Sequence, residues 1–243
     1  MATDRVGLSG GDFEDPSLLE VIAITREDAV AAAAGGADRL EVVSSIDLGG
    51  LTPALEQFQR IRDAVDLPLR VMLRTNGGFG VSPSELASLE EQIAGLREAG
   101  ADQFVLGFLD GDGALDLAAM EIVRSAIEPC PWTLHHAFDH AEDPVAAWEA
   151  ARRLPNLDGV LSGGVRGDLR HGLQTLCARI GWQSGDLRWL AGGGLILDYI
   201  RPLGNAGIRM FHIGRAARFD HSWQRPVSVD AVRLWRQSLD AIG

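Results

Sequence analysis

One short phrase occurs three times in this chain: a stretch of small residues ends at a glycine, and an apolar run follows shortly after it. The three glycines are Gly36, Gly100 and Gly207. A glycine can take the left-handed conformation that ends a helix, and an unbroken apolar run of about five residues suits a strand buried on both faces. The repeated unit is therefore predicted to be a helix, a tight turn and a buried parallel strand.

About eight apolar runs in the sequence are expected to be strands. They are residues 18–24, 40–43, 69–73, 104–108, 132–134, 159–161, 187–191 and 210–213. Amphipathic stretches separate these runs, and a length of 243 residues fits the roughly 250 residues of one (β/α)8 barrel. We therefore predict an α/β fold, a single TIM-barrel domain at residues 18–243, preceded by an N-terminal extension at residues 1–17. The alternative, an open doubly wound sheet, lacks its usual GxGxxG phrase, because residues 25–29 read TREDA.

Capping residues mark where several of the intervening helices should begin. They are Thr25, Thr52 before Pro53, Ser82 before Pro83, Asp116, Asp143 before Pro144, and Asp230. The helix after the sixth strand is expected at residues 165–179, a short one at 195–203, and the closing helix at 227–242.

Composition excludes several classes of function. The formal charge of −12 makes nucleic acid an unfavourable partner, because its phosphates would be repelled over most of the surface. The chain has no apolar run of the roughly 18 residues that a membrane span needs, so we expect a cytoplasmic protein that acts on a small molecule. Barrels of this kind often pair, and a homodimer is compatible with the sequence.

All 22 basic residues are arginines. Because a Schiff-base aldolase needs a lysine amine, that mechanism is excluded. Cys130 and Cys177 lie far apart with no CxxC spacing, so neither a disulfide framework nor a thiolate zinc site is indicated.

Polar side chains at strand ends are the candidates for chemistry, because barrel enzymes place their catalytic groups there. They are Glu20, Glu41, Arg74, His135, Asp139, Ser162 and His212. A carboxylate within an apolar strand costs several kcal/mol if it is buried without a partner. Glu20 and Glu41 are therefore read as a general base or a pair of oxygen ligands, with Arg74 as counter-charge or substrate clamp. A buried Glu-Arg network that merely satisfies itself is the alternative.

Two adjacent histidines follow the fifth strand, and neighbouring strand residues face opposite sides. We expect His135 to point inward as an acid or base, and His136 to pack or lie at the rim. A purely structural role is the alternative for His135. For His212, a functional role and a structural role are both left open.

Two glycine loops, after the seventh and eighth strands, predict an anion or phosphate site. The residues expected to bind the substrate there are Gly192, Gly193, Gly214 and Arg215, joined at the rim by Ser162 and Gly163. The alternative is that tight turns alone require these glycines.

Taken in order, these residues resemble the CutC family, which is named for a link to copper homeostasis. The phrases that carry the resemblance are residues 19–21, 35–41, 49–53, 71–74 with 77–78, 135 with 137–139, 162–164, 191–194 and 211–212. The resemblance implies the same barrel. It also implies a proposed Cu(I) site on two cysteines, but Ile22 and Val43 stand at those positions, so the soft thiolate ligands are missing. The chain also has Thr75 and Asn76 where the family commonly has Pro-Arg, and His136 where Arg is common.

We therefore expect an enzyme of isomerase, lyase or aldolase-like type that acts on a small anionic or phosphorylated metabolite by acid/base chemistry. Glu20 and Glu41 would supply base and acid, His135 the proton donor or carbonyl polariser, Arg74 the clamp, and Asp139 would lie nearby. No cofactor is required; a divalent metal on Glu41 and His135, or Cu(I), is compatible. The alternatives are a copper homeostasis protein that binds Cu(I) and a non-catalytic small-molecule receptor.

Overall fold

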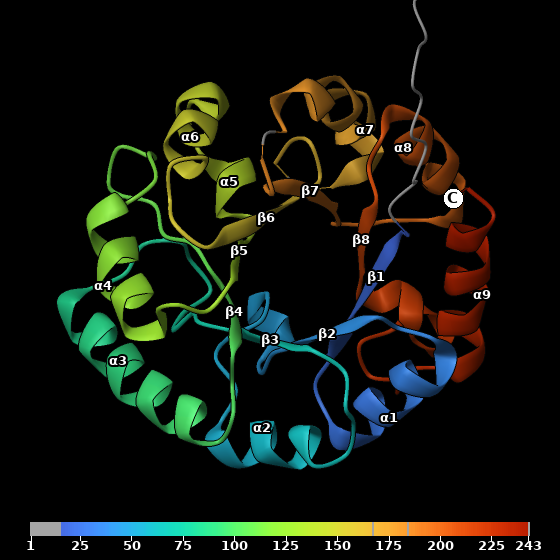
Figure 1. Cartoon of the computed structure of the whole chain (residues 1–243), viewed down its shortest axis with the longest axis horizontal. Helices are drawn as coiled ribbons and strands as arrows, with labels where there is room; N and C mark the ends of the chain where they lie inside the picture. Colours follow the sequence, from blue (N-terminus) through green and yellow to red (C-terminus); the bar gives the residue numbers. More distant parts are fainter. Residues whose placement is uncertain (1–15, 167, 184, 243) are drawn as a thin grey trace, which may run out of the picture.

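Eight parallel strands form a closed barrel in sequence order, and helices surround it (Figure 1). The structure, a computed structural model, describes residues 16–166, 168–183 and 185–242. The barrel confirms the predicted TIM fold. Of the predicted N-terminal extension, residues 1–15 lie outside the described part of the chain.

Each strand lies within two residues of the apolar run that predicted it. The strands are β1 Leu18–Ala23, β2 Arg39–Val42, β3 Leu69–Met72, β4 Gln103–Leu106, β5 Trp132–Leu134, β6 Leu157–Ser162, β7 Arg188–Ala191 and β8 Met210–Ile213. The α-helices are α1 Arg26–Gly35, α2 Leu55–Arg62, α3 Pro83–Glu98, α4 Leu117–Ile127, α5 Ala137–His140, α6 Pro144–Ala151, α7 Leu169–Ala178, α8 Ile200–Ala206 and α9 Val229–Asp240. Among the described residues, no helix combines the length and apolar character that crossing a bilayer requires.

Most predicted helix starts are confirmed by their hydrogen bonds. The Thr25 side chain accepts from the Asp28 amide at the start of α1, and the glycine of the repeated phrase, Gly36, ends that helix with φ of 94°. Ser82 and Glu85 form a reciprocal capping box at α3. Asp116 and Asp143 likewise cap α4 and α6.

Three predicted helix starts are wrong. Helix α2 begins at Leu55, because the Thr52 hydroxyl is engaged by the end of β3, where it accepts from the Arg74 amide at 2.9 Å. Helix α9 is capped by Ser228, and Asp230 lies in its first turn. Helix α7 begins at Leu169 after its cap Asp168, and not at residue 165.

The barrel buries apolar side chains on its outer side and charged ones within. Outward-facing residues such as Leu40, Phe104 and Trp189 pack against the helices and are fully buried. Inside the barrel, Arg70 of β3 donates to the Thr133 hydroxyl of β5 at 2.6 Å and to Asp158 of β6 at 2.7 Å. Arg70 thus connects β3 to β5 and β6 through hydrogen bonds inside the barrel, where most barrels pack layers of aliphatic side chains.

A second apolar cluster lies inside the barrel, separate from the outer core. It consists of Ile22, Val43, Met72 and Val105, with Trp223 packed against it. Side chains two residues apart on a strand share a face. Ile22 therefore lies on the same inner face as Glu20, and Val43 on the same inner face as Glu41, each one step nearer to the C-terminal end of its strand. Together these residues form an apolar plug between the charged interior and the barrel mouth.

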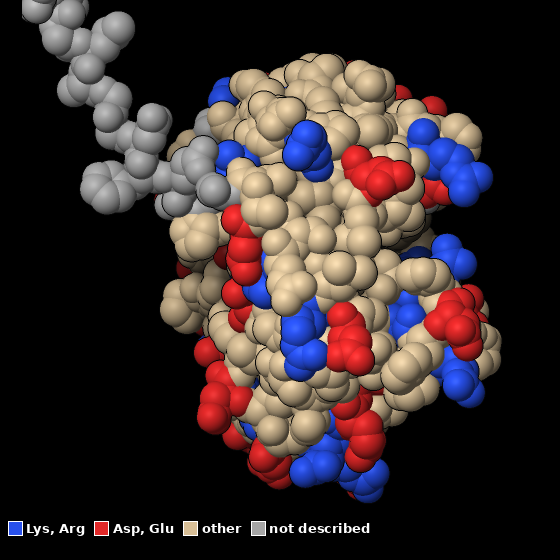
Figure 2. Space-filling view, turned by 90° about the vertical axis from the view of Figure 1, so that its right-hand side faces the viewer, with Lys and Arg blue, Asp and Glu red and all other residues tan. Residues whose placement is uncertain are grey.

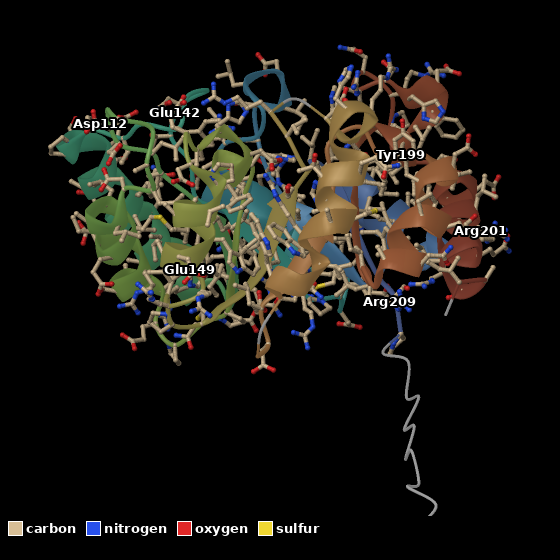
Figure 3. The ribbon with its side chains drawn as sticks, turned by 90° about the horizontal axis from the view of Figure 1, so that it is seen from above. Asp112, Glu142, Glu149, Tyr199, Arg201 and Arg209 are labelled. Carbon is tan, nitrogen blue, oxygen red and sulfur yellow. The ribbon has the colours of Figure 1, made fainter. Side chains whose placement is uncertain are left out.

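The two ends of the barrel are distinct in the side view. Figure 3 shows Asp112 and Glu142, in the connections after β4 and β5, at the upper end, and Arg209, just before β8, at the lower end. The upper end therefore carries the C-terminal ends of the strands, where barrel enzymes bind ligands. On the face shown in Figure 2, arginines lie among acidic residues instead of gathering in one basic patch.

The stacked tryptophans of the outer core should dominate local stability. Trp189 is fully buried and stacks on Trp148 with ring centroids 4.4 Å apart. Trp189→Ala is expected to lower the free energy of unfolding by about 3–5 kcal/mol through lost contacts and a cavity. Urea unfolding checks this, with Phe219→Ala as control: that ring is 50% exposed, and its loss should cost about 0.5 kcal/mol or less. Equal losses in the two variants would contradict the assignment of the core.

Candidate functional site

Three buried side chains from neighbouring strands meet inside the barrel: Glu20 of β1, Glu41 of β2 and His212 of β8. One possible ligand atom from each lies within 4.8 Å of the others. The register explains the meeting, because Glu20 stands opposite His212 on β8, while Glu41 stands opposite Ile22 on the other side of β1. The sequence predicted that Glu20 and Glu41 lie close together, and the structure adds His212 to them.

Glu20 is paired on both oxygens. Its Oε2 accepts from Nε of Arg39 at 2.5 Å, and its Oε1 lies 2.8 Å from Nδ1 of His212. Burial alone would raise the pKa of Glu20, but the Arg39 guanidinium and the His212 ring oppose it and lower the pKa to about 2. Glu20 is therefore an ionised group that holds His212 in place.

Glu41 has the opposite environment. Burial raises the pKa of its carboxyl to about 7, against the attraction of His212 and with help from the negative charge of Glu20. Its Oε1 is buried and has no hydrogen-bond partner, and its Oε2 lies 3.8 Å from Nε2 of His212, too far for a hydrogen bond. Glu41 can therefore gain or lose a proton near neutral pH, and one of its oxygens has no hydrogen-bond partner.

His212 lies between these two carboxyls. Burial by itself would lower the pKa of His212, but Glu41 and Glu20 together raise it above its ordinary value. If Glu20 accepts the Nδ1 proton, the Nε2 atom is left to face Glu41. A carboxylate that fixes one ring nitrogen while the other faces a reactive group is common to acid/base and to metal-binding histidines.

His135 is a buried, neutral histidine. Burial, with Arg74 nearby, lowers the pKa of its ring to about 3. The Nδ1 atom accepts from the Ala137 amide at 3.1 Å, while Nε2 is buried without a hydrogen-bond partner. A neutral imidazole with an unpaired nitrogen can polarise a carbonyl or hold a hydroxyl of a ligand.

His136, which the sequence predicted to pack or lie at the rim, is held by a buried carboxylate. Its Nδ1 lies 3.1 Å from Oδ2 of Asp139, and its side chain is 34% exposed. Asp139 in turn accepts from the Ser162 hydroxyl at 2.5 Å and from the Gly163 amide at 2.7 Å. Ser162 and Gly163, predicted to bind substrate, thus serve to position Asp139.

Arg74 holds loops instead of a carboxylate. Its guanidinium donates to the backbone carbonyls of Gly49, Gly50, Gly77 and Gly78 and stacks 4.8 Å above the Phe79 ring. For Glu20 the counter-charge comes from Arg39, whereas Arg74 interacts electrostatically with Glu41 without a hydrogen bond to it. Arg39 was missed because it stands at the first position of β2, inside the helix-ending phrase.

The glycines of the two predicted anion loops lie in different surroundings. A Cβ at position 192 would lie 3.1 Å from the His212 ring, and one at 193 would lie 3.1 Å from Cε1 of His136. Gly214 lies beneath Trp223, where a Cβ would be 2.3 Å from the indole. Arg215 is exposed.

A cavity of about 820 Å³ opens at the same end of the barrel, beyond Phe79. Its lining includes Asp112, Glu142 and His140, whose ring lies 4.6 Å from that of Phe79. The Phe79 ring also lies near the ring of His135, with centroids 5.5 Å apart. Phe79 therefore lines this cavity and also neighbours His135.

Fold and site together define a TIM barrel with a buried carboxylate and histidine centre below its mouth. The chain belongs to the CutC family, whose family model matches residues 17–217. A CutC family protein from Citrobacter koseri is 32% identical over 204 residues, covering 83% of this chain and 81% of that protein. A human protein named copper homeostasis protein cutC homolog is 34% identical over 197 residues, covering 80% of this chain and 72% of its own.

Solved structures show the same fold. A putative copper homeostasis protein CutC from Streptococcus agalactiae has a TM-score of 0.74 at 22% identity, covering 82% of this chain and 98% of that one. A thiamine phosphate pyrophosphorylase from Pyrococcus furiosus has a TM-score of 0.59 at 15% identity, with coverage of 93% and 96%. At these identities the likeness concerns the fold alone.

The raised pKa of Glu41 should appear in the pH dependence of stability. Between its unfolded value of 4.5 and about 7, folded Glu41 binds more protons than unfolded Glu41, so its contribution is full below 4.5 and lost as pH rises through 7. The free energy of unfolding of the wild type minus that of Glu41→Gln should fall by up to about 3 kcal/mol across this window. Urea unfolding at pH 4.5 to 8 measures it.

The control is Glu56→Gln, which removes an exposed carboxyl of α2 instead of a buried one. A Glu41→Gln difference that stays flat, or rises with pH, would mean that Glu41 is ionised throughout.

Proposed function

We propose that this protein is an enzyme of isomerase or lyase type that moves protons within a small anionic ligand at the barrel mouth. The observation that carries the proposal is Glu41, a buried carboxyl with a pKa of about 7 and one unpartnered oxygen. A general acid or base works best when its pKa lies near the operating pH. Perturbed groups of this kind concentrate at functional sites.

The neighbouring side chains support distinct roles. Glu20, ionised and paired on both oxygens, positions His212 and is not itself the base. His212 lies between Glu20 and Glu41, so it can exchange a proton with Glu41 through an intervening water or ligand atom. His135, neutral and unpaired at Nε2, suits the polarisation of a carbonyl oxygen.

Access to Glu41 depends on the apolar plug. Glu41 is 3% exposed, and Ile22, Val43 and Trp223 lie between it and the mouth. A ligand that reaches Glu41 must displace part of the plug, which would also exclude water from the reacting atoms. Trp223 is the natural part to move, because its loop follows β8 and is not part of the sheet.

Solvent exchange tests the enzyme proposal without a known substrate. Small carboxylates and phosphorylated carbonyl compounds are incubated with the protein in D₂O, and proton NMR follows deuterium entering positions next to the carbonyl. The wild type should label at least one compound, and Glu41→Gln should slow the labelling by about 10²–10⁴-fold. Glu56→Gln, on the exposed surface of α2, is the control and should behave as the wild type.

Labelling that persists in Glu41→Gln would remove this residue from the mechanism. Ligand binding without any labelling would favour the non-catalytic receptor.

Copper handling is the second candidate, and the names of the relatives favour it more directly, since they state copper homeostasis and no reaction. The donors present are Glu41, His212 and Glu20, which are oxygen and nitrogen ligands. Such ligands suit Cu²⁺, whereas Cu(I) prefers sulfur. The two cysteines do not supply it: Cys130 lies just before β5 at the opposite end of the barrel, and Cys177 lies on the outer helix α7.

If copper is the cargo, it should bind as Cu²⁺ at the buried cluster. His212→Gln should weaken Cu²⁺ binding at least tenfold, because it removes the one nitrogen ligand of the three. Electron paramagnetic resonance during a Cu²⁺ titration checks this, with Cys177→Ser as control and an anaerobic Cu(I) titration alongside. Tight Cu(I) binding that Cys177→Ser abolishes would contradict the assignment to this cluster.

A further inference from the structure

We propose that the His136 imidazole and the backbone amides of Gly193 and Gly194 form a subsite for an oxyanion, a phosphate or carboxylate group, at the rim of the barrel. The subsite deepens the proposed enzyme function, because it names where the anionic part of the ligand binds. It uses different residues from the Glu41 centre, so the two can fail separately.

The first support is that hydrogen bonds hold the His136 ring in place. Asp139, whose side chain is 2% exposed, accepts from the Ser162 hydroxyl, the Gly163 amide and the His136 ring. The Ser162 oxygen is itself fixed, because it accepts from the Gly164 amide at 2.9 Å. Two donors at the end of β6 therefore hold the Asp139 carboxylate, and that carboxylate in turn holds Nδ1 of the His136 ring. Second-layer bonds of this kind are typical of histidines that contact a ligand.

The second support is the free nitrogen of that ring. With Nδ1 bonded to Asp139, Nε2 of His136 has no hydrogen-bond partner among residues 16–166, 168–183 and 185–242. About a third of the side chain is exposed, so a ligand can reach it. In its protonated form, balanced by Asp139, the ring presents an N–H donor with a positive charge, the kind of donor that oxyanions bind most strongly.

The third support is the close approach of the β7 loop. A Cβ at position 193 would lie 3.1 Å from Cε1 and 3.5 Å from Nε2 of His136, so a larger residue there would have to shift the ring slightly. Gly193 and Gly194 have φ of 84° and 73°, in the left-handed region. In the described part of the chain, their amides donate to no partner. Gly193 lies against the His136 ring and Gly194 is exposed beside it in the loop, so an oxyanion at the ring can accept from amides that have no protein acceptor.

The placement differs from the sequence prediction in a useful way. The sequence assigned the positive group to Arg215 and the second loop to Gly214, but Gly214 is covered by Trp223 and Arg215 is exposed. Of the predicted anion site, the β7 loop with Gly193 is retained here, and His136, which the sequence did not assign to it, takes the place of the charged donor. One carboxylate opposes the subsite, that of Asp168, whose Oδ2 would lie 3.7 Å from a Cβ at position 194. The free ring nitrogen of His136 is therefore the donor on which anion binding depends most.

The chain supplies a matched control in a second histidine and aspartate pair with the same spacing. His171 and Asp168 lie 3.3 Å apart at the start of α7, where the side chains are 74% and 40% exposed. Asp168 also borders Gly194, so the control variant is made at His171 and not at Asp168. This pair has neither a buried carboxylate nor a glycine loop against the ring. Phosphate that merely sought an imidazole would bind the two histidines alike.

The experiment is a titration of the full chain with inorganic phosphate at pH 6, followed through the Cε1 proton signals of its six histidines. The His136 signal, identified by its loss in His136→Ala, should shift saturably, and that of His171 should not. His136→Ala should weaken phosphate binding, measured by calorimetry, about tenfold or more, and His171→Ala should leave it unchanged. A parallel titration with acetate tells whether the subsite prefers a phosphate or a carboxylate.

Asp139→Asn separately tests whether the Asp139 carboxylate positions the His136 ring. Asp139 is a positioning residue, so its loss should change the nitrogen-15 shifts that report which ring nitrogen of His136 carries the proton, and should weaken phosphate binding without unfolding the chain. Gly193→Ala should also weaken binding, by pushing the ring out of place.

Equal shifts of His136 and His171, or phosphate affinity unchanged in His136→Ala, would overturn the proposal. Glu41→Gln should bind phosphate as the wild type does. Phosphate binding without any solvent exchange would leave the subsite standing and refute the enzyme proposal, and exchange without phosphate binding would do the reverse.

Discussion

The buried carboxylate of Glu20 is the interaction on which the interior of this barrel depends. A carboxylate without a partner at this depth would cost several kcal/mol, so its bonds to Arg39 and His212 are a condition of the fold as well as of the site. The bonds join β2, β1 and β8, the strands where the first and last units of the barrel meet. The bonds that assemble the charged centre therefore also join the strands at which the barrel closes.

The opposite pKa shifts of Glu20 and Glu41 follow from these bonds. Arg39 and His212 take both oxygens of Glu20, which leaves Glu41 with a histidine 3.8 Å away and no arginine bonded to it. Two carboxyls of the same kind, on adjacent strands, are thus driven to opposite protonation behaviour by their partners. Pairs of titratable groups whose pKa values are pushed apart in this way are what acid/base assignments rest on.

Much of the fold could be predicted from the sequence because parallel barrel strands are buried on both faces and read as plain apolar runs. The glycine of the repeated phrase also marks the end of a helix, as Gly36 does for α1. The inward carboxylates Glu20 and Glu41 stood out for the same reason, since a charge in an apolar run is conspicuous. Arg39 and Arg70 did not stand out, because each is flanked by residues that are usual at the start of a strand.

The role of a residue was harder to predict than its position. Arg74 was found in sequence, but its four carbonyl partners come from loops whose path no local pattern specifies. His136 was set aside because two adjacent strand residues face opposite sides, yet β5 ends at Leu134 and the chain turns into α5 immediately after it. The alternation rule fails at the strand end, which is where barrel chemistry takes place.

The apolar plug connects these observations to function. Ile22 and Val43, which occupy the positions where cysteines would be expected from the family resemblance, pack with Met72, Val105 and Trp223 above the charged centre. Aliphatic side chains there keep water from Glu41, and the exclusion of water is what raises its pKa. A thiol pair at these two positions would favour soft-metal coordination. The same two positions that remove a sulfur site in this chain therefore create the dry environment in which Glu41 becomes a proton donor near neutral pH.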